Sequence, residues 1–178
     1  MHATFPDEPP SGAERTRHNR HHEQLKALAD IAAQGATLQP KADAAVADCG
    51  GAAPVHDSVA LDLGRSSHAY SALYERARHL SLDADLLETR DELCRVLSYH
   101  LHMLRDAGDL AFSGRPDPRT EPFRLELAEG LGSYATKLLT LAGEYRARLL
   151  TVERGEPDER FPLGADLELD DVELSDES

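Results

Sequence analysis

The chain has 178 residues, a formal net charge of −14 and two cysteines, Cys49 and Cys94. Its length fits one domain with tails, and a negative charge of this size disfavours binding to nucleic acid phosphates and to anionic lipid. Two cysteines cannot build a disulfide framework or a Cys-rich zinc site, and no stretch approaches the roughly 20 apolar residues of a membrane helix, so we expect a cytoplasmic protein without a membrane partner.

The first part of the chain is expected to be disordered and then to form short helices. Residues 1–19 are rich in Pro, Gly and charge, which favours disorder. Residues 21–34 carry apolar side chains at helical spacing, and Gly35 follows them as a stop signal. Residues 41–48, which come after Pro40, are mostly alanine and predict a second short helix.

The middle of the chain contains two stronger helix signals. Residues 50–65 show a weak alternation, for which we expect a docked extended loop because one strand cannot pair its own backbone. Residues 66–80 predict an amphipathic helix with Tyr70 on its apolar stripe. Residues 84–107 predict a longer helix that is apolar over about half its circumference, and Gly108 is expected to end it.

The last predicted helix covers residues 122–154 and again carries a wide apolar arc. An arc of this width is typical of a helix that contacts two neighbours, although it could also pair with a second copy of the chain across a two-fold axis. Gly130 and Gly132 allow a break, in which case the helix starts near Ser133.

The segment 156–178 differs from the rest of the chain in charge. It holds ten acidic residues and one basic residue, Arg160, and therefore carries −9 of the total charge of −14. Acidic and apolar residues alternate along it, a pattern that cannot bury enough surface to fold by itself. We therefore predict an all-α protein, in which residues 20–155 form a small helical bundle and residues 156–178 form a disordered acidic tail.

Nine histidines raise the question of a metal site. His18 and His22 are four residues apart and could share a helix face beside Glu23. A zinc site needs three or four ligands, so a surface helix is the favoured interpretation, and no metal or cofactor is predicted.

A different histidine marks a candidate buried polar site. His100 falls within the apolar arc of the 84–107 helix, and a buried imidazole needs a hydrogen-bond partner. Tyr134 or Tyr145 would supply one if the two long helices are antiparallel neighbours. Cys94 adjoins the same arc and is interpreted as an unreactive core thiol.

One fragment, residues 98–110, suggests an alternative function. The residues that carry the similarity are Ser98, His100, Leu101, Leu104, Arg105, Ala107, Gly108 and Leu110. They resemble the pattern S-x-H-L-x-x-L-R-x-A-G-L in the recognition helix of winged-helix repressors of the arsenical-resistance type. The resemblance implies wing strands at 110–113 and 123–127, and DNA contacts by Arg105 and Arg115.

The sequence contains no nucleophile elbow, phosphate-binding loop or dinucleotide-binding glycine pattern. We therefore expect a non-enzymatic cytoplasmic regulatory or adaptor protein that acts through protein–protein interaction. Its acidic tail is the candidate arm for a basic protein partner, and a homodimer is an open alternative. Arginine outnumbers lysine by 16 to 3, which is typical of GC-rich bacterial coding.

Overall fold

The computed structural model describes residues 12–51, 55–112 and 121–156, and every element in these ranges is a helix. The prediction of an all-α helical bundle is therefore confirmed. In chain order, the elements are α1 (Gly12–Gly50), α2 (Asp57–Arg78), the 3₁₀ turn η1 (Ala84–Leu86), α3 (Leu87–Phe112), α4 (Glu121–Ala128) and α5 (Gly132–Glu153).

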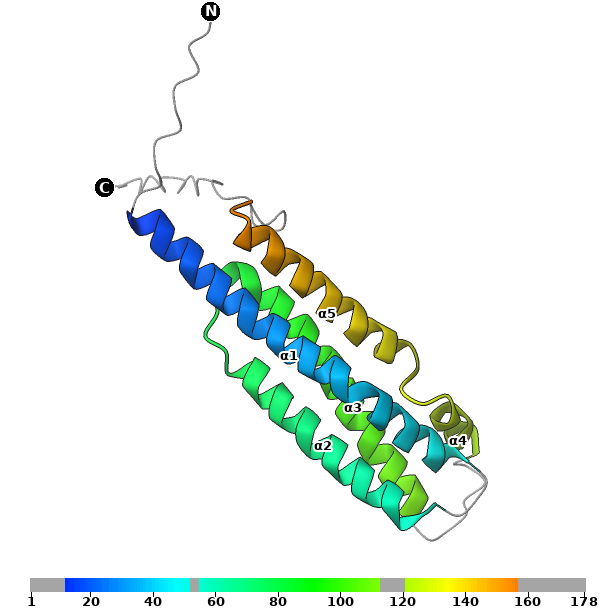
Figure 1. Ribbon diagram of the computed structural model, residues 1–178. Helices are drawn as coiled ribbons and strands as arrows, with labels where there is room; N and C mark the ends of the chain where they lie inside the picture. Colours follow the sequence, from blue (N-terminus) through cyan, green and yellow to red (C-terminus); the bar gives the residue numbers. More distant parts are fainter. Residues whose placement is uncertain (1–11, 52–54, 113–120, 157–178) are drawn as a thin grey trace, which may run out of the picture.

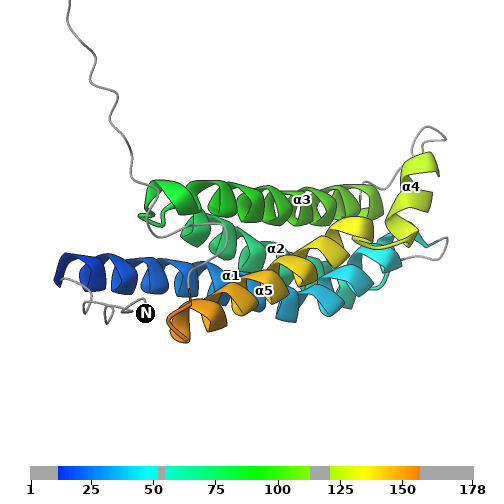
Figure 2. The ribbon, with the colours of Figure 1, turned by 90° about the horizontal axis from the view of Figure 1, so that it is seen from above.

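The long helices lie side by side along one axis (Figure 1). Helix α1 contacts α2, α3, α4 and α5, whereas α2 contacts α1 and α3. Helix α5 lies antiparallel to α1 and also packs against α3. Helix α3 runs behind this pair in Figure 1 and along the upper edge of the bundle in Figure 2. Helix α4 is short and covers the end of the bundle at which α1 finishes.

The core between these helices is built mainly from aliphatic side chains, because the chain has few aromatic residues and no tryptophan. The largest fully buried side chains are Tyr70, Tyr145, Leu25, Leu28, Ile31, Leu86, Leu93, Leu97, Leu104, Leu127, Leu131 and Leu138. They come from every helical element, so the described residues share one hydrophobic core.

Helix α1 is one continuous helix, and the prediction of two short helices at 21–34 and 41–48 is wrong. The helix also begins at Gly12, within the segment 1–19 that was expected to be disordered. Residues 1–11 lie outside the described residues. Mostly apolar buried residues recur on one face of α1 from His21 to Cys49, and burial of that face outweighs the local helix-breaking signals at Gly35 and Pro40.

Gly35 shows how tertiary contacts override a local stop signal. A Cβ atom at this position would lie 3.2 Å from Leu138 Cδ2 in α5 and 3.4 Å from Leu97 Cδ2 in α3. In addition, the Tyr70 hydroxyl of α2 donates a 2.9 Å hydrogen bond to the Gly35 carbonyl. The missing side chain therefore gives room to α3 and α5 at this point of α1, and the backbone carbonyl of the same residue binds α2.

Helix α2 starts earlier than expected, so the extended loop predicted for residues 50–65 is wrong from Asp57 onward. The imidazole of His56 caps the helix by accepting a 3.2 Å hydrogen bond from the Ser58 backbone N–H. Val59 and Leu63 lie one turn apart and are both buried. The buried apolar residues of this segment are therefore spaced four residues apart, as in a helix, although the sequence appeared to alternate as in a strand.

A break separates α4 from α5, which confirms the alternative of a helix that starts near Ser133. Gly130 and Gly132 have φ values of 70° and 57°, a left-handed conformation that glycine adopts without steric cost. The backbone N–H of Leu131, between them, donates a 2.7 Å hydrogen bond to Asp43 Oδ1 of α1. Asp43 thereby fixes the start of α5 against α1.

The predicted wing hairpin is wrong where the structure describes it. Residues 110–112 belong to α3, and residues 123–127 belong to α4. Helix α3 thus continues past Gly108, at which it was expected to end. Residues 113–120 and 157–178, which include nearly all of the predicted acidic tail, lie outside the described ranges. Among the described helices, none combines the length and the apolar character needed to cross a membrane.

Two glycines provide a matched test of the packing at the end of α1. A Cβ at Gly50 would clash with the α4 backbone, at 2.7 Å from both Ala128 Cα and the Arg124 carbonyl oxygen, whereas a Cβ at Gly64 in α2 meets nothing within 4 Å. We expect Gly50→Ala to lower the free energy of unfolding by about 1–3 kcal/mol. Gly64→Ala should raise it by about 0.5–1 kcal/mol.

Urea unfolding of both variants, followed by circular dichroism, measures these changes. Stabilisation by Gly50→Ala, or equal effects of the two substitutions, would show that α4 is not held closely against α1.

Candidate functional site

The predicted buried polar site of His100, Tyr134 and Tyr145 is not assembled, because the structure places the three residues in separate contacts. His100 is fully buried in α3, and its Nδ1–H donates a 2.8 Å hydrogen bond to the Val96 carbonyl one turn earlier. Its ring lies beside Tyr70 of α2, with 5.0 Å between the ring centroids.

The two tyrosines of α5 contact α3 instead of His100. The Tyr145 hydroxyl donates a 2.9 Å hydrogen bond to the Thr89 carbonyl. Tyr134 stacks on Tyr99 with ring centroids 3.7 Å apart. Both contacts hold α5 against α3, so the tyrosines act in packing.

Burial controls the protonation of the His100 and Tyr70 pair. Desolvation lowers the pKa of His100 despite opposing contributions from its bond to Val96 and from Asp43. Desolvation and the Asp43 carboxylate raise the pKa of Tyr70. Both rings are therefore neutral at pH 7. The sequence did not identify Tyr70 as the neighbour of His100, because no local pattern shows which residues of two different helices will meet.

Neither cysteine has the environment of a reactive thiol. Burial, followed by the neighbouring Asp48 carboxylate, raises the pKa of Cys49 to about 11. Burial also raises the pKa of Cys94, although Arg90 opposes that shift. Because the thiolate is the nucleophilic form, both residues are poorly suited to covalent chemistry.

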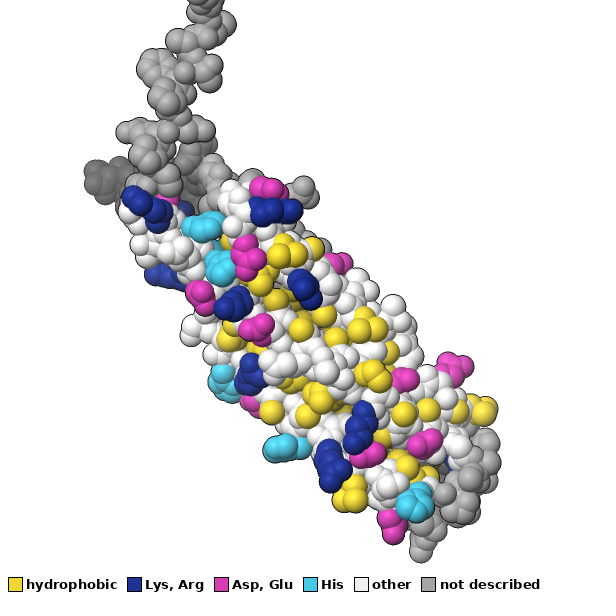
Figure 3. All heavy atoms as spheres, viewed as in Figure 1, with side chains coloured by type: hydrophobic (Ala, Val, Ile, Leu, Met, Phe, Trp, Pro, Cys, Tyr) yellow, Lys and Arg dark blue, Asp and Glu magenta, His cyan; other side chains and the backbone are white. Residues whose placement is uncertain are grey.

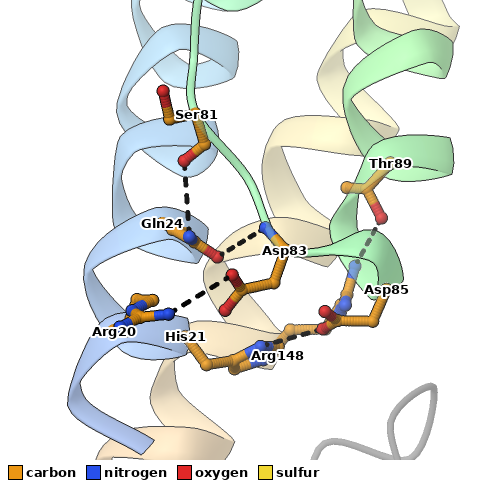
Figure 4. A network of polar contacts seen from close by, with 8 residues as sticks. All are labelled: Arg20, His21, Gln24, Ser81, Asp83, Asp85, Thr89 and Arg148. Atoms are coloured by element: carbon orange, nitrogen blue, oxygen red, sulfur yellow. Dashed lines mark hydrogen bonds and ion pairs between the residues drawn. The ribbon is translucent and has the colours of Figure 1, made fainter. Parts of the chain in front are cut away.

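A cluster of polar side chains lies around the turn between α2 and α3 (Figure 4). Its members are Arg20, His21, Gln24, Ser81, Asp83, Asp85, Thr89 and Arg148. We call this group the polar end cluster. It joins the first half of α1 to the turn before η1, to the start of α3 and to α5, so it fixes the connection between α2 and α3.

The central contact of the polar end cluster joins His21 Nδ1 to Asp85 Oδ2 at 3.0 Å, with both side chains largely buried. Around it, Gln24 donates to the Ser81 carbonyl at 3.3 Å and accepts from the Asp83 backbone N–H at 3.2 Å. Arg20 lies 3.9 Å from the Asp83 carboxylate. Both acidic groups thus have a nearby cationic or hydrogen-bonding partner from α1.

An open cavity of about 520 Å³ borders the polar end cluster. Thr16, Arg17, Arg20 and His21 of α1 line one side, while Asp83 and Asp85 line the other. The walls thus combine both signs of charge, and the acidic walls face α1 residues with which they already interact. This arrangement holds the helices in place.

The remaining candidate residues are dispersed. Arg105 is exposed on α3, and Arg115 lies outside the described residues. His22 contacts Glu23 and Glu153, each at 3.5 Å, instead of sharing a ligand with His18. The described residues contain no group of three or more His, Cys, Asp or Glu side chains suited to a metal ion.

The surface shared by α1 and α5 carries apolar side chains (Figure 3). We call it the α1/α5 face and define it by Ala33, Ala36, Pro40 and Ala44 of α1 and by Leu139, Ala142 and Leu150 of α5. Leu139 and Leu150 are 53% and 48% exposed, and it is their place beside other apolar side chains that distinguishes them from the similarly exposed Leu61 of α2 and Leu125 of α4. Their exposure means that α5 has more apolar surface than α1 and α3 cover.

The middle of this face also lacks charge. Residues 31–40 of α1 and 138–143 of α5 contain no Asp, Glu, Lys, Arg or His, although 29% of the chain is Asp, Glu, Lys or Arg. Gly35 and Leu138 bring the two segments together. An apolar centre without charge is characteristic of the buried centre of a protein interface.

The largely buried His21–Asp85 contact is expected to stabilise the fold. Removal of the carboxylate by Asp85→Ala leaves a buried imidazole without that partner, and we expect the free energy of unfolding to fall by about 1–3 kcal/mol. The matched control is Glu75→Ala, which removes the carboxylate of an exposed pair with His79 and should cost at most about 0.5 kcal/mol. Urea titration at neutral pH measures both values, and equal losses would contradict a structural role for Asp85.

His100 should make the stability depend on pH. Because its pKa is lowered in the folded state, the unfolded chain binds a proton first as the pH falls below about 6.5. Stability from this residue is therefore complete above about pH 6.5 and decreases below it. We expect His100→Gln to reduce the loss of unfolding free energy between about pH 7.5 and 5.5.

The control for this measurement is His68→Gln, because His68 is exposed on α2. It should leave the pH dependence of the unfolding free energy unchanged. An unaltered dependence in His100→Gln would show that the buried imidazole does not oppose protonation.

Comparison of the chain with protein-family models, curated proteins and solved structures found no match.

Proposed function

We propose that this protein is a non-enzymatic cytoplasmic adaptor or regulatory protein, and that its α1/α5 face binds a helix of a partner protein. The observation that supports the proposal most directly is the exposed Leu139 beside the uncharged segments 31–40 and 138–143. Exposed apolar surface of this kind costs solubility, and a binding partner that covers it removes the cost.

The geometry of the face favours a helical partner. Two antiparallel helices present parallel ridges of side chains, between which a third helix packs a ridge of its own. The uncharged segment 31–40 spans roughly 15 Å along α1 at about 1.5 Å per residue, which corresponds to about three turns of a bound helix. Such a helix would carry apolar residues at positions i, i+3 or i+4, and i+7.

Small side chains strengthen this interpretation. Ala33, Ala36 and Ala44 lie on the α1 side of the face, where they allow a partner backbone to come close. Leu139 of α5 is large and exposed and would insert between side chains of the bound helix. The face thus combines small side chains on α1 with a large, exposed side chain on α5.

The acidic segment 156–178 supplies a second possible contact in this proposal. Its charge of −9 would attract a partner whose helix has basic flanking residues. A second copy of this chain is the competing occupant of the α1/α5 face. DNA binding through Arg105 stays a prediction of the resemblance. Arg105 lies on α3, which packs against α1, α2 and α5, and this position adds no support for DNA binding.

A photo-cross-linking residue at position 139 of the full chain tests the proposal in a cell extract. We expect cross-links to a partner segment with helical apolar spacing, and the same residue at position 61 serves as the control because Leu61 is 61% exposed on α2. A synthetic peptide of the captured segment should bind the purified protein. Leu139→Asp should weaken that binding by about ten- to a hundredfold, since burial of a leucine contributes about 1.5–3 kcal/mol.

Leu61→Asp should leave the affinity of the peptide unchanged. Equal cross-linking at positions 61 and 139, or peptide binding that is insensitive to Leu139→Asp, would overturn the proposal. Cross-links between two copies of the chain would assign the face to a homodimer instead.

A further inference from the structure

Two tyrosines from different helices lie face to face at the edge of the core. The ring centroids of Tyr99 in α3 and Tyr134 in α5 are 3.7 Å apart, and the ring planes differ by 15°. This separation is shorter than the distance of about 4.5–7 Å that is usual for aromatic pairs. Both side chains pack against the core and are partly exposed, so the ring carbons of α3 and α5 touch where solvent reaches them. We call Tyr99 and Tyr134 the tyrosine stack.

Neighbouring contacts hold the tyrosine stack in register. One turn after Tyr134, Lys137 of α5 pairs with Glu92 of α3 at 3.2 Å. Further along the same helix, the hydroxyl of Tyr145 is hydrogen-bonded to α3. The two rings therefore face each other because the helices that carry them are fixed on one another.

The composition of the chain makes the tyrosine stack a preferred target for oxidation. There is no tryptophan, so the phenol rings of the five tyrosines are its most readily oxidised aromatic groups. Tyr70 and Tyr145 are buried, and their hydroxyls donate hydrogen bonds to backbone carbonyls. The partly exposed tyrosines are thus Tyr74 on α2 and the two members of the stack.

The surroundings of Tyr99 determine what happens to its proton. Burial raises the pKa of Tyr99, and the Glu126 carboxylate and Tyr134 raise it further. The phenol is therefore neutral at pH 7, and removal of an electron from its ring must be accompanied by loss of the hydroxyl proton. Glu126 is exposed on α4 and supplies a nearby carboxylate that can accept this proton.

We propose that the tyrosine stack is a modification site at which a one-electron oxidant joins α3 to α5 through a carbon–carbon bond. Each phenol gives one electron to a molecule of oxidant and its hydroxyl proton to water or, for Tyr99, to Glu126. The two phenoxyl radicals combine between ring carbons ortho to their oxygens. Each of these carbons then loses its hydrogen as a proton while each oxygen regains one, so the product lacks two hydrogen atoms.

Contact between the rings favours coupling within one chain over coupling between chains. Because both side chains are partly exposed, the rings have room to turn from the stack into the angled geometry of the product. The bond closes a loop that contains α4 and the glycine break before α5, and such a closure constrains the unfolded chain. Oxidation therefore locks this part of the fold, and it does so independently of the α1/α5 face.

Photo-oxidation of the purified full-length protein with ruthenium tris-bipyridine and persulfate, a one-electron oxidant that needs no enzyme, tests the proposal. We expect the blue fluorescence of dityrosine in the band that runs as a monomer on a denaturing gel. Trypsin digestion and mass spectrometry should identify residues 96–105 joined to residues 125–137, with two hydrogen atoms missing. The oxidised monomer should also unfold at a higher urea concentration than the untreated protein.

Three variants and one change of conditions separate a built site from general reactivity of tyrosines. Tyr99→Phe and Tyr134→Phe each keep a ring but remove a phenol, and each should abolish the cross-link within the monomer. Tyr74→Phe is the matched control and should leave its yield unchanged. Oxidation in urea that unfolds the chain should lower the yield, because the rings are then no longer held together.

Four results would refute the proposal. These are monomer fluorescence that persists in Tyr134→Phe, a cross-link that involves Tyr74, products that join separate chains alone, and a yield that is equal in the folded and the unfolded protein.

Discussion

The close packing of α1 at Gly35 is the contact on which the arrangement of the other long helices depends. At this point the side chains of Leu138 and Leu97 approach the α1 backbone from α5 and α3, and Tyr70 of α2 donates a hydrogen bond to the Gly35 carbonyl. A Cβ atom at this position would require the ends of the Leu138 and Leu97 side chains to shift. The absence of this side chain thus allows close packing of α3 and α5 against α1.

The antiparallel pairing of α1 and α5 produces the apolar face for which we propose a function. Along the middle of the pair, the uncharged segments meet and leave Leu139 exposed. At one end, the contact of His22 with Glu153 holds the last turn of α5 against α1. The packing of this one pair of helices therefore provides an apolar face for a protein partner.

Polar contacts at the bundle ends determine how the helices are connected. Asp43 of α1 accepts from the Leu131 backbone N–H and sets the turn between α4 and α5. The polar end cluster does the same for the connection between α2 and α3 through Gln24 and His21. In each case a side chain of α1 satisfies or neutralises groups that would otherwise be left at a helix end, so α1 organises both ends of the molecule.

The sequence by itself determined the helical class, the apolar stripes of α2, α3 and α5, and the glycine break before α5, because these features depend on residue spacing along one helix. It also indicated that His100 is buried, but it gave the wrong partner: Tyr70 lies on another helix, and no local pattern specifies which stripes meet. Tertiary structure decided that α1 passes through Gly35 and Pro40, that residues 57–65 are helical, and that the α1/α5 face stays open. The physical reason is that burial against neighbouring helices can outweigh local propensities of about 1 kcal/mol at glycine and about 3 kcal/mol at proline.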